Sequence, residues 1–124
     1  MLRSAAVTAF LATVDPGRAR AFYRDTLGLP LVSEDDFALV FDTHGAPLRV
    51  QKVANLTPQP FTALGWQVSS IGQVVRQLRQ RGVMFERYPF LEQDDDGVWL
   101  APSGTRVAWF KDPDGNILSI SQSP

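Results

Sequence analysis

The sequence has no cysteine and a single histidine, His44, among 124 residues. The lack of cysteine excludes disulfides, thiolate metal sites and a cysteine nucleophile, although it does not fix the compartment. No Ser–His–Asp set, paired carboxylate or candidate base with an obviously perturbed pKa can be named. The sequence therefore assigns no catalytic residue.

Long apolar runs and a charge excess are also missing. No apolar run approaches the ~20 residues of a membrane span. Residues 1–6 precede alternating sequence rather than the apolar block of a signal peptide, so a cytoplasmic location is expected. The sequence has twelve basic and thirteen acidic residues, so it lacks the excess of positive charge typical of nucleic-acid-binding proteins. The hydrophobic content of 44% is enough for a real core.

What the sequence does contain is one pattern written twice. In the first copy, small and β-branched residues predict a strand over residues 5–14. Asp15 and Pro16 favour a helix start, and Gly28 favours its end because glycine adopts a left-handed conformation cheaply. Three short strands are predicted next, over residues 29–33, 37–41 and 48–53.

The second copy repeats this order at similar length. A strand is predicted over residues 61–68 and a helix from Ser70 to Gly82, followed by strands over residues 83–87, 98–101, 105–111 and 116–122. The fold class is α+β, with two tandem βαβββ modules over residues 5–53 and 61–122 and a linker over residues 54–60. Because one face of each sheet packs on its own helix, the other needs a partner. The prediction is a curved mixed sheet around a cavity, with the helices outside.

The stretch from Phe110 to Ile120 predicts two strands joined by a tight turn. Asp112 can accept hydrogen bonds from amides beyond it, Pro113 fixes a corner angle, and Gly115 can take a positive φ. This hairpin and the helix end over residues 21–29 resemble the vicinal-oxygen-chelate superfamily (glyoxalase I, bleomycin-resistance proteins, extradiol dioxygenases). The resemblance covers essentially the whole chain and implies the two-module fold. A ferredoxin-like or other α+β domain is the alternative.

The resemblance also implies where a divalent metal would be bound in metal-using members. The matching positions here are Thr8, Ala63, Arg49 or Gln51, and Ser119. None of these is an ordinary ligand for a catalytic divalent ion, which prefers imidazole and carboxylate. A displaced site using His44 with Glu34 or Asp42 is the alternative. We predict no metal site and no cofactor.

A mostly apolar cavity with a few convergent polar groups is typical of small-molecule sites. Tyr88 belongs to the loop over residues 86–97, which is either a lid or a solubilising turn. Arg49 either meets an anionic ligand or lies on the solvent side. Trp66 and Trp109 are expected to be core or interface anchors. The candidate ligand-binding residues are Thr8, Phe10, Arg49, Gln51, Gln67, Tyr88, Trp99 and Ser119.

These observations predict a metal-free small-molecule-binding protein of the glyoxalase/bleomycin-resistance type. Its ligand is expected to be aromatic or anionic. Exposed sheet edges and the resemblance imply a homodimer, and the charge balance and the lack of long apolar runs predict that it binds neither nucleic acid nor membrane. Two alternatives stay open. One is a lyase- or dioxygenase-like enzyme with an unusual or absent metal, and the other is a non-catalytic interaction module whose cavity is filled.

Overall fold

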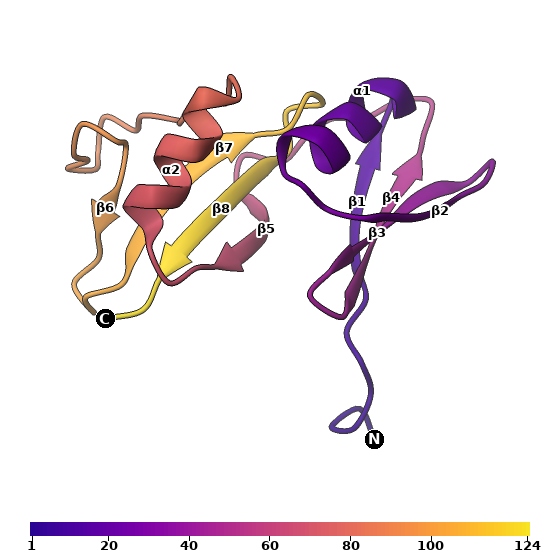
Figure 1. Ribbon diagram of the computed structural model, residues 1–124, viewed down its shortest axis with the longest axis horizontal. Coiled ribbons are helices and arrows are strands. Elements are labelled where there is room, and N and C mark those ends of the chain that lie inside the picture. Colours follow the sequence, from indigo (N-terminus) through magenta and orange to yellow (C-terminus); the bar gives the residue numbers. More distant parts are fainter. The chain divides into compact units, whose positions relative to one another are not determined.

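Each half of the chain forms a four-stranded sheet with a helix on one face (Figure 1). The computed structural model describes residues 1–124 and divides them into two units, Met1–Thr57 and Pro58–Pro124. The boundary falls within the linker predicted over residues 54–60. The α+β class and the tandem repeat are therefore confirmed. No helix has the length and apolar character needed to cross a membrane.

The elements of the first unit follow the predicted order. They are β1 (Ala9–Thr13), α1 (Pro16–Arg20), the π-helical segment η1 (Ala21–Thr26), β2 (Leu31–Glu34), β3 (Ala38–Thr43) and β4 (Ala46–Lys52). The sheet order is β1-β4-β3-β2, in which β1 and β4 are parallel and the other pairs are antiparallel. A parallel pair needs a crossover, and the helical segment supplies part of it.

The core of this unit follows from strand alternation. Leu11, Val50 and Leu39 are register neighbours across three strands, and all are buried. From the helical side, Tyr23 is fully buried and its ring lies 5.6 Å from that of Phe41. The face that carries these residues is therefore the one packed against the helix, as the period of two requires.

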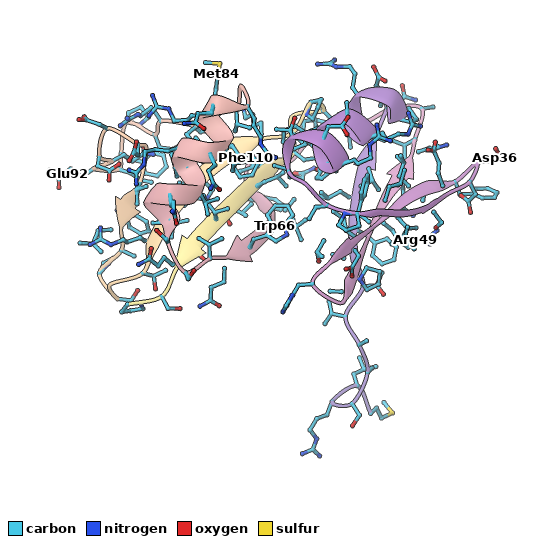
Figure 2. All side chains as sticks on the ribbon, in the orientation of Figure 1. Asp36, Arg49, Trp66, Met84, Glu92 and Phe110 are labelled. Carbon is cyan, nitrogen blue, oxygen red and sulfur yellow. The ribbon has the colours of Figure 1, made fainter.

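The second unit repeats the topology. Its elements are β5 (Thr62–Gln67), α2 (Ile71–Gln80), β6 (Trp99–Leu100), β7 (Arg106–Lys111) and β8 (Ile117–Gln122), in the sheet order β5-β8-β7-β6. Figure 1 shows α2 lying across β7 and β8. The helix buries Ile71, Val75 and Leu78, and Phe110, labelled in Figure 2, is 1% exposed on β7. Burial of these apolar side chains holds α2 on the sheet.

Two predicted strands differ from the structure. The first strand begins at Ala9 rather than at residue 5, because its partner Leu48 is preceded by Pro47, which has no N–H to extend the ladder. The strand predicted over residues 83–87 is reduced to one bridge between Phe85 and Phe110. The amide of Glu86 still donates to the carbonyl of Trp109 on β7, whereas the carbonyl of Glu86 and the amide of Tyr88 bond to the side chain of Gln93.

The first helix is irregular where a uniform one was predicted. After Arg20 it widens into a π-helical turn, in which the amide of Leu27 donates to the carbonyl of Phe22 at 2.9 Å. Gly28 then ends it with a φ of 76°, the left-handed conformation predicted for this position.

The hairpin between β7 and β8 has the predicted chemistry. Oδ1 of Asp112 accepts from the amides of Asp114 at 3.0 Å and Asn116 at 2.9 Å. Gly115 has a φ of 90° and donates its amide to the carbonyl of Asp112. The turn is therefore held by a side chain that satisfies backbone donors, and it serves a structural role.

Candidate functional site

Four aromatic rings gather in the second unit. On β7 the buried Ala108 and Phe110 point towards α2, so Trp109 lies on the opposite face of the sheet. The ring of Trp109 lies 5.5 Å from Tyr88 at an interplanar angle of 85° and 6.1 Å from Trp99 at 33°. Tyr88 in turn lies 5.6 Å from Phe90. Aromatic pairs prefer such edge-on and tilted contacts.

This cluster borders a pocket of about 220 Å³, which we call the aromatic pocket. The residues that form its apolar wall are Phe61, Tyr88, Phe90, Leu91, Trp109 and Ile117. Phe90 is 80% exposed and Phe61 is 62% exposed, so these two rings lie at the rim. Flat apolar walls of this kind favour a planar ligand.

The polar groups of the pocket are few. Trp109 donates its Nε1–H to Oγ1 of Thr62 at 3.1 Å. The hydroxyl of Tyr88 has no hydrogen-bond partner in the chain, and burial together with the nearby charge of Glu86 raises its pKa. Tyr88 therefore stays protonated at neutral pH and keeps a donor.

The loop over residues 86–97 is ordered by its own side chains. Gln93 accepts from the amide of Tyr88 at 2.8 Å and donates to the carbonyls of Glu86 and Gly97 at 2.9 and 2.8 Å. Arg87 donates to the carbonyls of Gln93 and Asp95. The loop is therefore a fixed wall that holds the Tyr88 backbone in place. No local sequence pattern predicts this role for Gln93.

A larger hollow of about 370 Å³ lies beside the end of α2. Arg79, on its wall, forms an ion pair with Asp96 at 3.2 Å. The guanidinium of Arg87 donates hydrogen bonds to two carbonyls of the loop over residues 86–97. Met84 at this end is 82% exposed and projects outward (Figure 2). Because both guanidinium groups on this wall are already bonded within the chain, we place the candidate site at the aromatic pocket.

The predicted residues of the first unit lie on the face away from its helix. Phe10 and Arg49 are register neighbours on β1 and β4, Phe10 is 55% exposed, and Gln51 follows Arg49 on the same face. Arg49 is half-buried, and its guanidinium forms no ion pair within the chain. Thr8 is exposed and precedes β1. The structure brings together Phe10, Arg49 and Gln51 but leaves Thr8 outside the strand.

The predicted residues of the second unit divide into two groups. Tyr88 and Trp99 belong to the aromatic cluster. Ser119 pairs with Gly65 on β5 and Trp109 on β7, so it shares the face of the cluster. Gln67 lies further along that face and donates to the hydroxyl of Ser123. Trp109 was expected to be an anchor, and the structure places it on the pocket wall instead.

The residues present do not fit a divalent metal. The four positions implied for ligands offer hydroxyls, an amide, a methyl group or a guanidinium, and Ala63 falls where the β5–β8 register shifts. For the displaced site, Glu34 is held by Arg20 and Lys52, and Asp42 accepts from the amide of Gly45. No group of three or more His, Cys, Asp or Glu residues is close enough to hold an ion.

Comparison with solved structures gives the same architecture. A glyoxalase family protein from Enterococcus faecalis superposes with a TM-score of 0.76 at 19% identity, over 98% of this chain and 99% of that one. A lactoylglutathione lyase from Agrobacterium tumefaciens superposes with a TM-score of 0.74 at 17% identity, over 97% of this chain and 95% of that one. A glyoxalase/bleomycin resistance protein/dioxygenase from Nocardioides superposes with a TM-score of 0.74 at 20% identity, over 98% of this chain and 84% of that one. Identities this low show the fold alone.

Among curated proteins, none is significantly similar to this chain. The sequence model of one family does match, and it spans residues 5–120, nearly the whole length. The chain therefore belongs to the Glyoxalase/Bleomycin resistance protein/Dioxygenase superfamily.

Proposed function

We propose that this protein binds a small planar aromatic molecule in the aromatic pocket and holds it without a divalent metal ion. The observation that carries the proposal is the ring arrangement around Trp109. Tyr88 meets its ring edge-on at 5.5 Å, and both residues line a pocket of about 220 Å³. An aromatic ligand there would bury apolar area and gain ring contacts of about 0.5–1.5 kcal/mol each.

The chemistry of the residues supports binding rather than turnover. One solved structure of similar fold is a lactoylglutathione lyase, and the resemblance implies where metal-using members of the superfamily hold their ion. Here the matching positions carry Thr8, Ala63, Arg49 or Gln51, and Ser119, which do not supply imidazole or carboxylate. The pocket wall carries no carboxylate, imidazole or amine to act as a general base. No catalytic step is assigned to any residue.

Ligand binding is tested by thermal shift and equilibrium dialysis with two neutral naphthalenes, 2-isopropylnaphthalene and 2-acetonaphthone. A binder gains stability by mass action, so the melting temperature should rise with probe concentration. Trp109→Leu should abolish the rise, because it removes the central ring. Trp66→Leu is the matched control, since Trp66 lies on β5 outside the pocket wall (Figure 2). The proposal would be refuted if the melting temperature of the wild-type protein did not rise, or if that of Trp109→Leu rose as much as that of the wild type.

A further inference from the structure

The aromatic pocket carries two hydroxyl groups whose donor capacity is unused. Oγ1 of Thr62 accepts from Trp109 Nε1 at 3.1 Å, so the hydroxyl proton of Thr62 is directed elsewhere. The hydroxyl of Tyr88 makes no hydrogen bond within the chain, whereas its backbone amide is bound by Gln93 at 2.8 Å. The backbone and ring of Tyr88 are fixed, and its remaining polar group is a donor.

The same pocket has no formal charge on its wall. The two charged side chains that act on the Tyr88 hydroxyl, Glu86 and Lys111, pair with each other at 3.3 Å. Their side chains are 29% and 50% exposed, so the pair is partly solvated, and the two charges act on the Tyr88 hydroxyl in opposite directions. A charged ligand group entering the apolar wall would lose water without gaining an opposite charge, which is costly.

The size of the pocket bounds the ligand. A cavity of about 150 Å³ is enough for a benzene ring, and the aromatic pocket measures about 220 Å³. A ligand of one ring or two fused rings therefore matches it, with the rim rings Phe61 and Phe90 covering its exposed edge. Larger polycyclic molecules would extend beyond the wall.

Resting on the proposed function, we infer that the ligand is an uncharged aromatic molecule of one or two rings that carries a hydrogen-bond acceptor, such as a carbonyl oxygen. The acceptor receives a hydrogen bond from the hydroxyl of Tyr88, and the hydroxyl of Thr62 makes a smaller contribution. An acceptor satisfies these donors, whereas a hydrocarbon leaves them without a partner, and the difference gives the selectivity.

The test compares two probes of similar shape by equilibrium dialysis. In 2-acetonaphthone a carbonyl oxygen stands where 2-isopropylnaphthalene has a methyl group. Tyr88→Phe keeps the ring and removes the hydroxyl, so it should weaken binding of the ketone about five- to tenfold and that of the hydrocarbon less than about twofold. Thr62→Val should weaken binding of the ketone by a smaller factor than Tyr88→Phe does. The anionic 2-naphthoate and the cationic 2-naphthylmethylammonium should both bind the wild-type protein at least about tenfold more weakly than the ketone.

The outcomes separate this inference from the function on which it rests. If both neutral probes bind but Tyr88→Phe and Thr62→Val weaken them equally or leave them unchanged, the acceptor assignment is wrong and the aromatic site stands. Tighter binding of either charged probe overturns the uncharged class. If no probe binds, the aromatic site itself is refuted. Should Tyr88→Phe not fold, as judged by its melting curve, Thr62→Val and the four-probe comparison on the wild-type protein still decide the question.

Discussion

The hydroxyl of Ser119 lies in the space that a side chain at position 65 would need. Gly65 and Ser119 are register partners in the parallel ladder between β5 and β8, and a Cβ on Gly65 would collide with Oγ of Ser119. The carbonyl oxygen of Ser119 would also lie only 3.4 Å from that Cβ. The absence of a side chain at position 65 thus lets β8 present Ser119 beside Trp109.

The first prediction follows from this contact. Gly65→Ala should lower the free energy of unfolding by about 1–2 kcal/mol, since overpacking forces atoms to shift. Ser119→Ala should restore part of that loss in the double variant, because it removes the colliding oxygen. Urea denaturation of the four proteins of this double-mutant cycle measures the coupling.

Gly72→Ala is the matched control for this cycle. A Cβ there would meet only side-chain atoms of Arg76, at an ordinary 3.5 Å. Within a helix alanine is favoured over glycine by up to about 1 kcal/mol, so Gly72→Ala should stabilise the protein. If both glycine variants change stability in the same direction, the collision at Ser119 has no energetic consequence.

The second prediction concerns the β7–β8 turn. Asp112 is 5% exposed, and its carboxylate accepts two backbone amides and the side-chain amide of Asn116 at 2.8 Å. Asp112→Ala should cost about 2–3 kcal/mol of unfolding free energy, since buried donors would lose their acceptor. Asp36→Ala, at the exposed tip of the β2–β3 hairpin (Figure 2), should change stability by less than about 0.5 kcal/mol. Equal denaturation midpoints for the two variants would contradict this account.

The turn also shows how much of the fold could be predicted from the sequence. Asp112, Gly115 and Gly28 act through contacts within a few residues along the chain, so local chemistry was enough to place them. Gln93 acts across the loop on three backbone groups, and no local pattern distinguishes it from a surface glutamine. One of its bonds takes the carbonyl of Glu86, at the end of the strand predicted over residues 83–87.

The candidate site was only partly predictable for a similar reason. Tyr88 and Trp99 were identified as ligand platforms, but Trp109 was assigned to the core or an interface. Strand alternation places Trp109 on a face without saying what approaches that face. The approach is made by Tyr88, whose position depends on the loop hydrogen bonds and not on the strand pattern.

The third prediction is a pH dependence at Glu34. Hydrogen bonds from Arg20 at 2.7 Å and from Lys52 at 2.9 Å lower the pKa of Glu34 from 4.5 to about 2. A carboxyl whose pKa is lower in the folded state stabilises the fold above the unfolded pKa, and this stabilisation is lost as the pH falls towards the folded pKa. The contribution should be present at pH 5 and largely absent at pH 2.

Melting temperatures of the wild-type protein and Glu34→Gln test this prediction. The difference between the two proteins should be largest above pH 5 and should shrink as the pH falls to 2. Since all three side chains are partly exposed, added salt should also reduce it. Glu92→Gln, on the outer loop, is the control and should show no such trend (Figure 2). A gap that is independent of pH would show that the ion pairs do not stabilise the fold.

The fourth prediction is that the protein is a homodimer. Each sheet ends in edge strands, β1 and β2 in one and β5 and β6 in the other, and such edges favour pairing unless they are protected. Phe37 beside the β2–β3 turn is 76% exposed, and Leu100 on β6 is 54% exposed. Light scattering at micromolar concentration should give twice the mass of one chain. A concentration-independent mass of a single chain would refute the prediction.

The fifth prediction is that the purified protein carries far less than one divalent ion per chain. The positions that match the metal ligands of metal-using members carry Ser119, Thr8 and other residues that bind divalent ions weakly or not at all. Elemental analysis after dialysis measures the content, and added Zn²⁺, Ni²⁺ or Mn²⁺ should leave the melting temperature unchanged, because an ion that does not bind the native state cannot stabilise it. Weak Ni²⁺ retention that disappears in His44→Ala would reflect the single exposed histidine. Stoichiometric metal that resists dialysis and persists in His44→Ala would replace the binding proposal with the enzyme alternative.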